Sequence, residues 1–456
     1  QDAIDNASAG DTLNIWAWSY NESILIDESI SLIGNSSSTT NIVAGTEEYD
    51  SDNPYVVKIT ADDVVVENIN FTATTSDFDI LYSSDTDAIS LLNNIFYYSS
   101  AYSSSTTTVE LQYGDNHIIS GNIIYPGEGS LRLYEVSNCL VNNNLLDNIW
   151  HGSSSGGGGS FEVTSSDNNI FENNTLDDSV YGLLLGGGSD HNIIRNNTVI
   201  SQSSNCYTCT SYAAIRIESS HNNTIIANNL TLSEKGIRIG GSASRDNTII
   251  GNSISDNNFG IHFYANADYN KVEGNVIKDS TSYGVRIDNS THISFWNNTI
   301  SSSGTKDFYL ENNAISNYVV NTTFSTVSVD STSYLTIKSY LDLDVNDASG
   351  NNMSGIDIKV MENDVQKYAT SYFGGSDSKT DSYGTIATFL INHKIYNGSS
   401  TPTTIPTYVT ARSHDWVETF TSDPSSTIQI TVPDLRVQNT RTGTLTYHIQ
   451  TSIDAA

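Results

Sequence analysis

The sequence predicts an all-β protein in which a parallel β-helix is followed by a β-sandwich. Two short motifs recur in step along the chain, one rich in asparagine and one with the pattern apolar-x-apolar. From residue 167 to residue 300 both recur every 22 to 24 residues, apart from one longer step. No stretch with helical periodicity interrupts them, and a fixed period in this range is typical of repeat architectures.

The asparagine motifs place one or two polar residues directly before a strand-forming segment. They are Asn173-Asn174-Thr175-Leu176, Asn196-Asn197-Thr198-Val199, Asn228-Asn229-Leu230, Gly251-Asn252-Ser253-Ile254, Gly274-Asn275-Val276-Ile277 and Asn297-Asn298-Thr299-Ile300. Asparagine tolerates the left-handed backbone that a sharp corner needs, and its amide can bond the equivalent amide of the next coil. We therefore predict an asparagine ladder that serves the fold.

The apolar-x-apolar motifs predict short strands, in which successive side chains point alternately into the core and toward solvent. They are Val109/Leu111, Leu131/Leu133, Phe161/Val163, Leu183/Leu185, Ile215/Ile217, Ile237/Ile239, Ile261/Phe263, Val285/Ile287 and Phe308/Leu310. Each repeat holds about three such strands, so one repeat is predicted to be one coil, and about twelve coils stack.

Residues 1–12 are predicted to form a capping helix, because Ala3, Ile4 and Ala7 share a helical face and Gly10 follows. The open end of a solenoid core must be covered. The predicted β-helix then spans residues 13–325. Its early coils are predicted to include single strands at residues 64–71 and 89–96.

The opening of the chain resembles a known class of protein. The motifs are Gln1-Asp2-Ala3-Ile4-Asp5-Asn6-Ala7, Gly10-Asp11-Thr12, Tyr20-Asn21-Glu22-Ser23-Ile24 and Ser31-Leu32-Ile33-Gly34. They are similar to the start of right-handed β-helix proteins of the NosD-like class, which are abundant among archaeal and bacterial surface proteins. The resemblance covers roughly residues 1–325 and implies a right-handed solenoid. It leaves function open, since the class hosts structural proteins, carbohydrate-active enzymes and a periplasmic copper-delivery factor.

Residues 333–435 show alternating strands at irregular spacing, which is typical of a β-sandwich. The predicted strands are 335–338, 341–345, 356–360, 386–390, 408–411 and 428–432. Asn346-Asp347-Ala348-Ser349-Gly350 and Thr380-Asp381-Ser382-Tyr383-Gly384 are similar to turns of immunoglobulin-like modules related to carboxypeptidase regulatory domains. That resemblance implies a spacer or an adhesion unit.

The tail, residues 436–456, repeats the beginning of the chain. Gln450-Thr451-Ser452-Ile453-Asp454-Ala455-Ala456 matches residues 1–7 at Gln, Ile, Asp and the final Ala. We interpret the chain as one module of a tandem array, or as a subunit whose tail caps the β-helix of a neighbouring copy. Both arrangements are head to tail, which propagates into a filament if it does not close into a ring.

Composition points to the outside of the cell. The formal net charge of -33 is unfavourable for nucleic acid and for an anionic membrane, and no apolar run could span a bilayer. The start at Gln1 suggests a processed product or a fragment. Thirteen Asn-x-Ser/Thr sequons are candidate glycosylation sites in an extracellular, cell-surface protein: Asn6, Asn21, Asn35, Asn70, Asn173, Asn196, Asn222, Asn229, Asn289, Asn297, Asn321, Asn352 and Asn397.

The three cysteines have different predicted roles. Cys206 and Cys209 lie in the one long step of the repeat, where we expect a small disulfide that pins the loop. A redox pair or half of a metal site is the alternative for this C-x-x-C motif. Cys139 lies in an apolar strand and is predicted to be a buried free thiol.

The outward residues of the apolar-x-apolar strands form one column. In order they are Glu110, Arg132, Glu162, Leu184, Arg216, Arg238, His262, Arg286 and Tyr309. Four of the nine arginines fall here, with neighbouring coils about 4.8 Å apart. A ladder of ion pairs with Glu218 and Asp288 is the simpler explanation. The alternative is a stripe of Arg132, Arg216, Arg238, His262 and Arg286 that binds an acidic glycan or an adjacent subunit.

We predict no catalytic site, no metal site and no cofactor. Asp177 and Asp178 follow Thr175 too closely to match a polygalacturonase, and Arg216 with Glu218 is the best available lyase candidate. Copper delivery would need clustered His, Met or Cys. A calcium ion held by Asp342, Asp344, Asn346 and Asp347 is a lesser alternative to plain Asp-rich turns.

These observations together favour an extracellular structural subunit of a cell-surface filament, sheath or surface layer that assembles head to tail. Its expected partners are copies of itself. The alternative is a polysaccharide-binding or polysaccharide-cleaving β-helix protein, with an acidic glycan as its partner.

Overall fold

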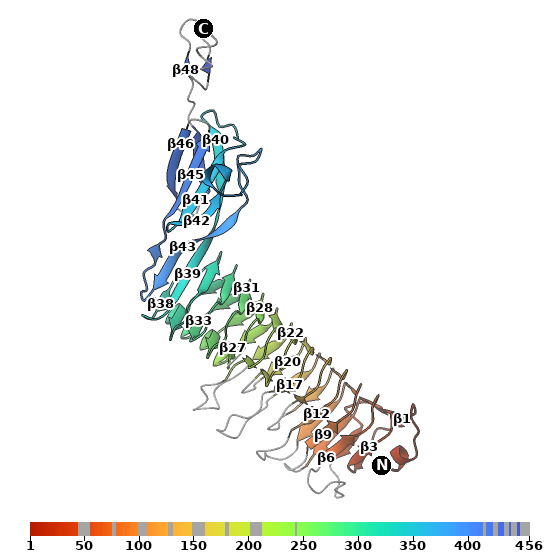
Figure 1. Ribbon diagram of the computed structural model, residues 1–456. Helices are drawn as coiled ribbons and strands as arrows, with labels where there is room; N and C mark the ends of the chain where they lie inside the picture. Colours follow the sequence, from red (N-terminus) through yellow and green to blue (C-terminus); the bar gives the residue numbers. More distant parts are fainter. Residues whose placement is uncertain are drawn as a thin grey trace. The chain divides into compact units, whose positions relative to one another are not determined.

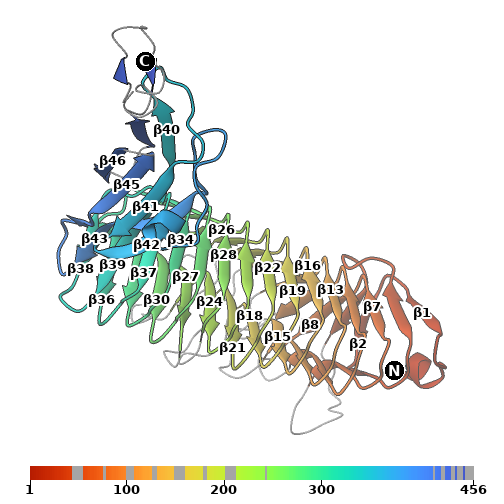
Figure 2. The same ribbon diagram turned by 45° about the horizontal axis from the view of Figure 1, so that its top comes forward.

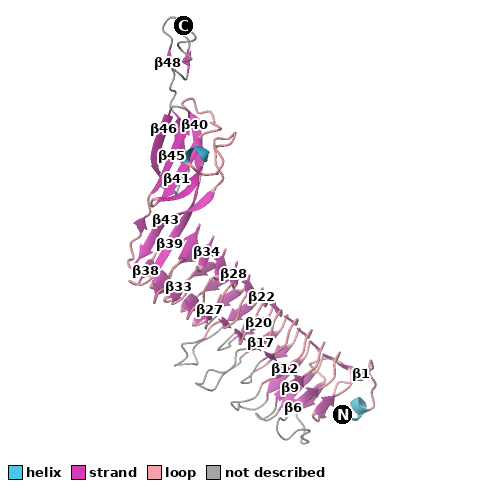
Figure 3. Ribbon diagram, viewed as in Figure 1, coloured by secondary structure: helices cyan, strands magenta, loops and turns pink. Residues whose placement is uncertain are grey.

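The computed structural model describes residues 1–43, 55–74, 79–98, 107–125, 131–147, 160–177, 182–200, 212–241, 244–413, 416–422, 427–432, 437–438 and 445–446. Contacts divide the chain into two units, one of residues 1–317 and 322–334 and one of residues 318–321 and 335–456. Helical structure in the described residues is limited to α1 (Asp2–Asp5) and the 3₁₀ turn η2 (Ser371–Phe373), and none of it is long enough to cross a membrane (Figure 3).

The first unit is a right-handed parallel β-helix whose coils each contribute a strand to three long sheets (Figures 1 and 2). Sheet A runs through β1 (Thr12–Ile15), β4 (Ser31–Gly34), β7 (Val65–Glu67), β10 (Ser90–Leu92), β13 (Ile118–Ser120), β16 (Leu140–Asn142), β19 (Ile170–Glu172), β22 (Ile193–Arg195), β25 (Thr224–Ile226), β28 (Thr248–Ile250), β31 (Lys271–Glu273) and β34 (Ser294–Trp296). The strand β37 (Asn317–Val320) crosses the division between the two units in the sequence.

Sheets B and C complete each coil. Sheet B runs through β2 (Ser19–Asn21), β5 (Asn41–Val43), β8 (Asn70–Ala73), β11 (Ile95–Tyr98), β14 (Ile123–Ile124), β17 (Leu145–Asp147), β20 (Thr175–Asp177), β23 (Thr198–Ile200), β26 (Asn229–Thr231), β29 (Ser253–Ser255), β32 (Val276–Lys278) and β35 (Thr299–Ser301). Sheet C runs through β3 (Ile24–Ile26), β6 (Tyr55–Ile59), β9 (Asp79–Ser84), β12 (Val109–Gln112), β15 (Leu131–Tyr134), β18 (Phe161–Thr164), β21 (Leu183–Gly186), β24 (Ile215–Glu218), β27 (Lys235–Gly240), β30 (Phe259–Tyr264), β33 (Tyr283–Asp288), β36 (Lys306–Glu311) and β38 (Val327–Val329).

The core of the β-helix is built from apolar side chains that stack on their equivalents one coil away. In sheet C, Ile215 pairs in register with Ile237, which pairs with Ile261, and the column continues through Val285 and Phe308. All five are fully buried. Burial of such columns is the main driving force for the fold. The predicted β-helix is confirmed.

The two asparagines of each pair have different structural roles. The first of each pair, such as Asn173 or Asn196, is exposed and turns the corner with φ of 55°. The second is buried, and its amide bonds the next coil: the Asn174 N–H donates to Asn197 Oδ1 at 2.9 Å, and the Asn197 N–H donates to Asn228 Oδ1 at 2.9 Å. The ladder satisfies backbone groups that the tight corner leaves without sheet partners. The predicted asparagine ladder is confirmed.

Two early strand predictions are wrong. The sequence predicts a single strand over residues 64–71 and another over 89–96, but each segment forms two strands, one in sheet A and one in sheet B. The chain turns at Asn68 and Asn93, whose φ values are 59° and 55°. A residue in the left-handed region redirects the backbone and ends the strand.

The second unit is a β-sandwich. Its strands are β39 (Tyr334–Leu341), β40 (Leu343–Asp347), β41 (Asp357–Glu362), β42 (Val365–Ala369), β43 (Phe389–Asn397), β44 (Thr403–Thr404), β45 (Thr407–Ser413), β46 (Trp416–Ser422), β47 (Ile428–Val432), β48 (Val437–Gln438) and β49 (Leu445–Thr446). Strands β42, β41, β45 and β46 form an antiparallel sheet, while β40 pairs with β47. Val345 and Ile430 from one layer share a buried core with Ile358 and Val409 from the other.

Candidate functional site

The outward face of sheet C carries the predicted column in unbroken register. Strand pairing places the following residues on consecutive coils: Glu110, Arg132, Glu162, Leu184, Arg216, Arg238, His262, Arg286 and Tyr309. Every member of the predicted stripe therefore lies in one line. Leu184 divides this line into two parts with different electrostatics.

The first part is a set of alternating charges. Arg132 lies between Glu110 and Glu162 in register, and its Nη1 is 3.1 Å from Glu110 Oε1. Opposite charges on neighbouring strands stabilise each other modestly. The ion-pair explanation accounts for Arg132.

The second part places cations directly next to one another. Arg216 and Arg238 are neighbours in register, and both contact Glu218, at 2.6 Å from Arg216 Nη2 and 3.4 Å from Arg238 Nη1. Arg286 donates from Nε and Nη2 to Glu311 Oε1 at 2.8 and 2.5 Å. Glu218, two residues beyond Arg216, and Glu311, on the coil after Arg286, thus offset repulsion between the arginines.

Tyr264, which lies two coils beyond Glu218, contacts both Glu218 and Arg238. Its hydroxyl donates to Glu218, and its ring lies 4.0 Å from the Arg238 guanidinium. The ring occupies the space over Gly240, where a Cβ atom would lie 1.7 Å from it. Burial alone raises the pKa of Glu218, but hydrogen bonds from Arg216 and Tyr264 outweigh it and leave that pKa below its ordinary value.

His262 is the one member of the second part without a carboxylate partner in the described chain. Its side chain is 7% exposed, and neither ring nitrogen has a hydrogen-bond partner among the described residues. Burial first, and then the charges of Arg286, Lys235 and Arg238, lower its pKa to about 3. At neutral pH the ring is therefore uncharged and offers one donor and one acceptor. A buried polar group left in this state is costly to the fold.

A row of aromatic rings flanks the arginines. Phe259 stacks on Tyr283 with ring centroids 5.5 Å apart, and Tyr283 stacks on Tyr309 at 4.6 Å. Lys235 pairs in register with Phe259, which pairs with Tyr283, and the Lys235 ammonium lies 5.2 Å from the Phe259 ring centroid. Burial lowers the pKa of Lys235 to about 8, although Glu234 partly opposes this.

We define the sheet C site as these arginines with the charged and aromatic residues around them. Its members are Arg216, Glu218, Lys235, Arg238, Phe259, His262, Tyr264, Tyr283, Arg286, Tyr309 and Glu311. Sequence reasoning identified the arginines, His262, Glu218 and Tyr309, but it missed Lys235, Tyr264, Phe259, Tyr283 and Glu311. The missed residues lie two or three positions from the arginine column and repeat with the same period, so reading the neighbouring columns would have found them.

The predicted glycosylation positions lie mostly at corners and turns. Of the thirteen sequon asparagines, all are exposed except Asn70, which is half-buried. Cys206 and Cys209 lie outside the described residues. Cys139 is a buried free thiol as predicted, and burial raises its pKa to about 12.

The Asp-rich turn proposed as a calcium alternative is closed by its own hydrogen bonds. Asp347 accepts from the N–H groups of Ser349 and Asn351, both at 2.8 Å, and Asp342 accepts from Thr388. Within the described ranges there is no group of three or more His, Cys, Asp or Glu side chains that could hold a metal ion.

Two family models match the chain. The model for periplasmic copper-binding protein (NosD) matches residues 152–282, and the model for the right handed beta helix region matches residues 22–211. The chain is a parallel β-helix protein that is similar to NosD over these residues. The similarity to NosD covers under a third of the chain and includes the strands β24 to β30. Comparison with curated proteins gives no match.

Solved β-helix structures share the architecture at low identity. A periplasmic alginate epimerase, AlgG, is 12% identical over 69% of this chain and 77% of its own, with a TM-score of 0.43. An exopolygalacturonase from Thermotoga maritima is 11% identical over 61% and 83%, with a TM-score of 0.43. The A-module of a mannuronan C-5 epimerase from Azotobacter vinelandii is 14% identical over 71% and 93%, with a TM-score of 0.44. Similarity at this level shows the fold alone.

Proposed function

We propose that this protein is an extracellular β-helix protein that binds an acidic polysaccharide along the sheet C site. His262 carries the proposal, because it is buried, neutral and without a hydrogen-bond partner in the described chain. A sugar hydroxyl or carboxylate that accepts a hydrogen bond from the ring N–H would remove part of the penalty of the unpaired ring. Binding sites keep such polar groups for ligands more readily than the interior of a fold does.

The charges around His262 favour an anion. Arg238 and Arg286 lie on the coils before and after it, and Lys235 begins the neighbouring row. Arg286 uses Nε and Nη2 on Glu311, and no hydrogen bond from its Nη1 is found within the described part of the chain. A carboxylate next to His262 would therefore meet guanidinium donors without displacing Glu311.

The aromatic row favours a sugar over a compact anion. Phe259, Tyr283 and Tyr309 are half-buried and stack along the rod beside the arginines. Flat apolar rings of this kind present surface on which the C–H face of a pyranose can pack. A uronic-acid polymer also carries only one charge per sugar, which suits a chain with a net charge of -33 better than a densely charged polyphosphate.

The test is calorimetric titration of the full chain with oligogalacturonate and oligoalginate, with neutral dextran oligomers as the comparison ligand. The double substitution Arg216→Glu with Arg238→Glu should weaken binding roughly a hundredfold, since each charged hydrogen bond contributes about 1.5–3 kcal/mol. The matched control is Arg195→Glu with Arg245→Glu. It makes the same charge change at partly exposed positions off sheet C, where Arg195 pairs with Glu172 and Arg245 with Asp246.

Retention of binding in the control and loss in the sheet C variant would support the proposal. Equal loss in both would show a general charge effect and would overturn it, as would equal affinity for dextran. The same mixtures should be assayed for shortened or unsaturated sugars, because we propose binding without cleavage. Released products that depend on Arg216 and Glu218 would favour the polysaccharide-cleaving alternative.

A second proposed function is that of a structural subunit in a cell-surface filament, sheath or layer, assembling head to tail. The repeat of the opening motif in residues 450–456 supports it. Twelve exposed sequon asparagines suit a glycosylated protein outside the cell. Negative-stain microscopy of the purified chain tests the assembly, because dispersed particles at all concentrations would argue against a filament. Intact-mass measurement on protein from a glycosylating host tests the glycans.

A further inference from the structure

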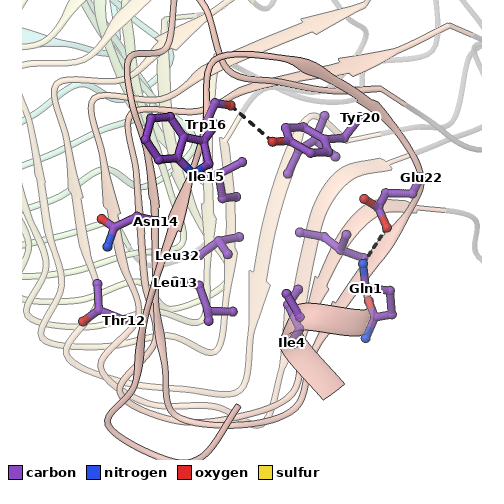
Figure 4. Close-up of a pocket in the computed structure, with 13 residues that line it drawn as sticks. Gln1, Ile4, Thr12, Leu13, Asn14, Ile15, Trp16, Tyr20, Glu22 and Leu32 are labelled. Atoms are coloured by element: carbon purple, nitrogen blue, oxygen red, sulfur yellow. Dashed lines mark hydrogen bonds and ion pairs between the residues drawn. The ribbon is translucent and has the colours of Figure 1, made fainter. Parts of the chain in front are cut away.

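Four consecutive coils have an apolar side chain on the outward face of sheet A. In a β-helix the apolar residues of a sheet are expected to point inward, as Leu13 and Leu32 do at the first coil, where they line an apolar pocket with Ile4 (Figure 4). On four later coils an outward position is apolar as well, and strand pairing aligns Ile118, Leu140, Ile170 and Ile193 there. We call these four residues the outer apolar column. Ile118 is 41% exposed, and the other three are half-buried.

The fold does not require apolar residues in the outer apolar column. The same outward position is Ser90 on the coil before it, and it is Thr224 and Thr248 on the two coils after it. All of these strands pair in the same register, so a small polar side chain serves the sheet equally well. Exposed apolar side chains that gather in one place mark an interaction surface, whereas single ones do not.

A row of aspartates borders this face at the corner between sheets C and A. On each coil the aspartate lies three residues before the outward position of sheet A, and the row consists of Asp62, Asp87, Asp115, Asp167 and Asp190. We call it the acidic edge. The Asp115 N–H donates to Asp87 Oδ1 at 2.8 Å, and the Asp190 N–H donates to Asp167 Oδ1 at 2.7 Å. Three residues span at most about 11 Å, so the acidic edge runs close beside the outer apolar column.

The fold does not require the charge of the acidic edge either. Ser137 takes the same position on the coil between Asp115 and Asp167, and its Oγ accepts the hydrogen bond from the Asp167 N–H at 3.2 Å. A neutral oxygen thus replaces the carboxylate, while like charges on neighbouring strands destabilise a sheet. Little positive charge offsets this repulsion, because eight acidic residues and a single Lys or Arg occur in the segments 62–67, 87–92, 115–120, 137–142, 167–172 and 190–195. That one residue, Arg195, is paired with Glu172 at 2.5 Å.

We propose that the outward face of sheet A, with the acidic edge beside it, is a docking surface for a basic protein partner that presents apolar side chains next to its Lys or Arg residues. Cationic groups of such a partner would neutralise the stacked carboxylates, and its apolar side chains would cover the outer apolar column. A second copy of this chain, with a net charge of -33, would add negative charge at the acidic edge, and so would an acidic polysaccharide. The surface belongs to a different sheet from the sheet C site, and the inference depends on neither proposed function.

The first test measures the binding of three octapeptides to the full chain by fluorescence anisotropy at physiological ionic strength. One peptide alternates leucine with lysine, the second serine with lysine, and the third leucine with glutamate. We expect saturable binding of the first, at least tenfold weaker binding of the second and no binding of the third. Equal binding of the first two would show a general attraction of cations to an acidic chain and would overturn the proposal. This series uses the wild-type chain, so its outcome does not depend on the folding of any variant.

The second test removes charge from the acidic edge. Asp87→Asn with Asp115→Asn keeps both side-chain oxygens that accept from the next coil, so the fold should be retained while two charges are lost. Affinity for the leucine–lysine peptide should fall at least tenfold. The matched control, Asp256→Asn with Asp364→Asn, makes the same charge change at exposed positions away from sheet A and should change affinity less than twofold. Equal losses in the two variants would contradict the proposal.

The third test changes the outer apolar column. Ile118→Gln with Leu140→Gln should also weaken binding of the leucine–lysine peptide at least tenfold. Val276→Gln with Val365→Gln, at positions 44% and 56% exposed on other sheets, should leave binding unchanged. Sedimentation velocity of the chain without peptide examines the alternative occupant. Self-association of the wild-type chain that is lost in the Ile118 and Leu140 variant would show that a second copy covers this face, and the basic partner would then be wrong.

Discussion

Two columns of side chains run along the same β-helix and differ in how regularly they repeat and in whether their polar groups are hydrogen-bonded. The buried asparagines of the corner repeat one residue type coil after coil, and each amide is bonded to the next coil. The outward column of sheet C changes residue type at almost every coil. Beyond Leu184 it brings like charges together around His262, whose ring has no partner among the described residues.

The difference separates what the fold needs from what a ligand needs. A position that repeats unchanged satisfies the same backbone groups in every coil, so its residue type is explained by stability. A position that departs from the repeat and leaves a polar group unsatisfied lowers stability and is expected to have another purpose. By this criterion the corner column is structural, and the sheet C site is the place to look for function.

The largest effect is expected from breaking the corner column. Asn228→Leu removes the acceptor used by the Asn197 N–H at 2.9 Å and the donor to Ile194 O at 2.9 Å, both of them buried. Leaving two buried backbone groups unpaired should lower the free energy of unfolding by about 2–6 kcal/mol. Denaturant unfolding followed by circular dichroism measures the change.

The matched control is the neighbouring Asn229→Leu. Asn229 is exposed on β26, so the same substitution there should change the free energy of unfolding by less than about 0.5 kcal/mol. Equal losses in the two variants would mean that the amide ladder is not what distinguishes the buried asparagine. That result would remove the contrast between the two columns.

The repeat made the fold and part of the site predictable. Its two markers located the coils, the core column, the ladder and the outward column that contains Arg216, because strand periodicity fixes which side chains point the same way. The corners at Asn68 and Asn93 were missed, since a left-handed residue inside an apolar run looks like a continuous strand. The burial of His262 and its lack of a hydrogen-bond partner among the described residues could not be predicted from the sequence either, because they depend on the side chains of adjacent coils.

The next largest effect is expected from replacing His262. The replacement should leave stability unchanged or raise it, whereas it should weaken binding. His262→Leu removes a buried ring with unpaired nitrogens and installs the residue that Leu184 already supplies in the same column. The free energy of unfolding should stay equal or rise by about 1 kcal/mol. Affinity for the acidic oligosaccharide should fall roughly tenfold, as measured by calorimetry.

Replacement by a polar residue tests whether hydrogen bonding is the cause. His262→Gln keeps a donor and an acceptor, so it should recover most of the affinity that His262→Leu loses. A fall in the unfolding free energy of more than about 1 kcal/mol in His262→Leu, with affinity unchanged, would identify His262 as a structural residue. That result would contradict the proposed difference between the corner column, which serves stability, and the sheet C site, which binds a ligand.

The smallest effect is expected from pH, through Lys235. Burial lowers its folded-state pKa to about 8, below the ordinary value of 10.5, so the folded chain loses this proton first as pH rises. Between about pH 8 and pH 10 the unfolded chain therefore binds more protons, and the contribution of this group to stability rises with pH. Affinity for the anionic ligand should move the other way and fall roughly two- to fivefold, because one cation leaves the site.

Lys235→Met serves as the control, because it keeps the apolar stem of the side chain and removes the titration. At constant ionic strength its affinity should already be low at pH 7 and should change little up to pH 9. His262, with a pKa of about 3, stays neutral over this range, whereas Lys235, with a pKa of about 8, loses its charge. An equal fall in affinity in wild type and Lys235→Met would assign the pH effect to another part of the chain.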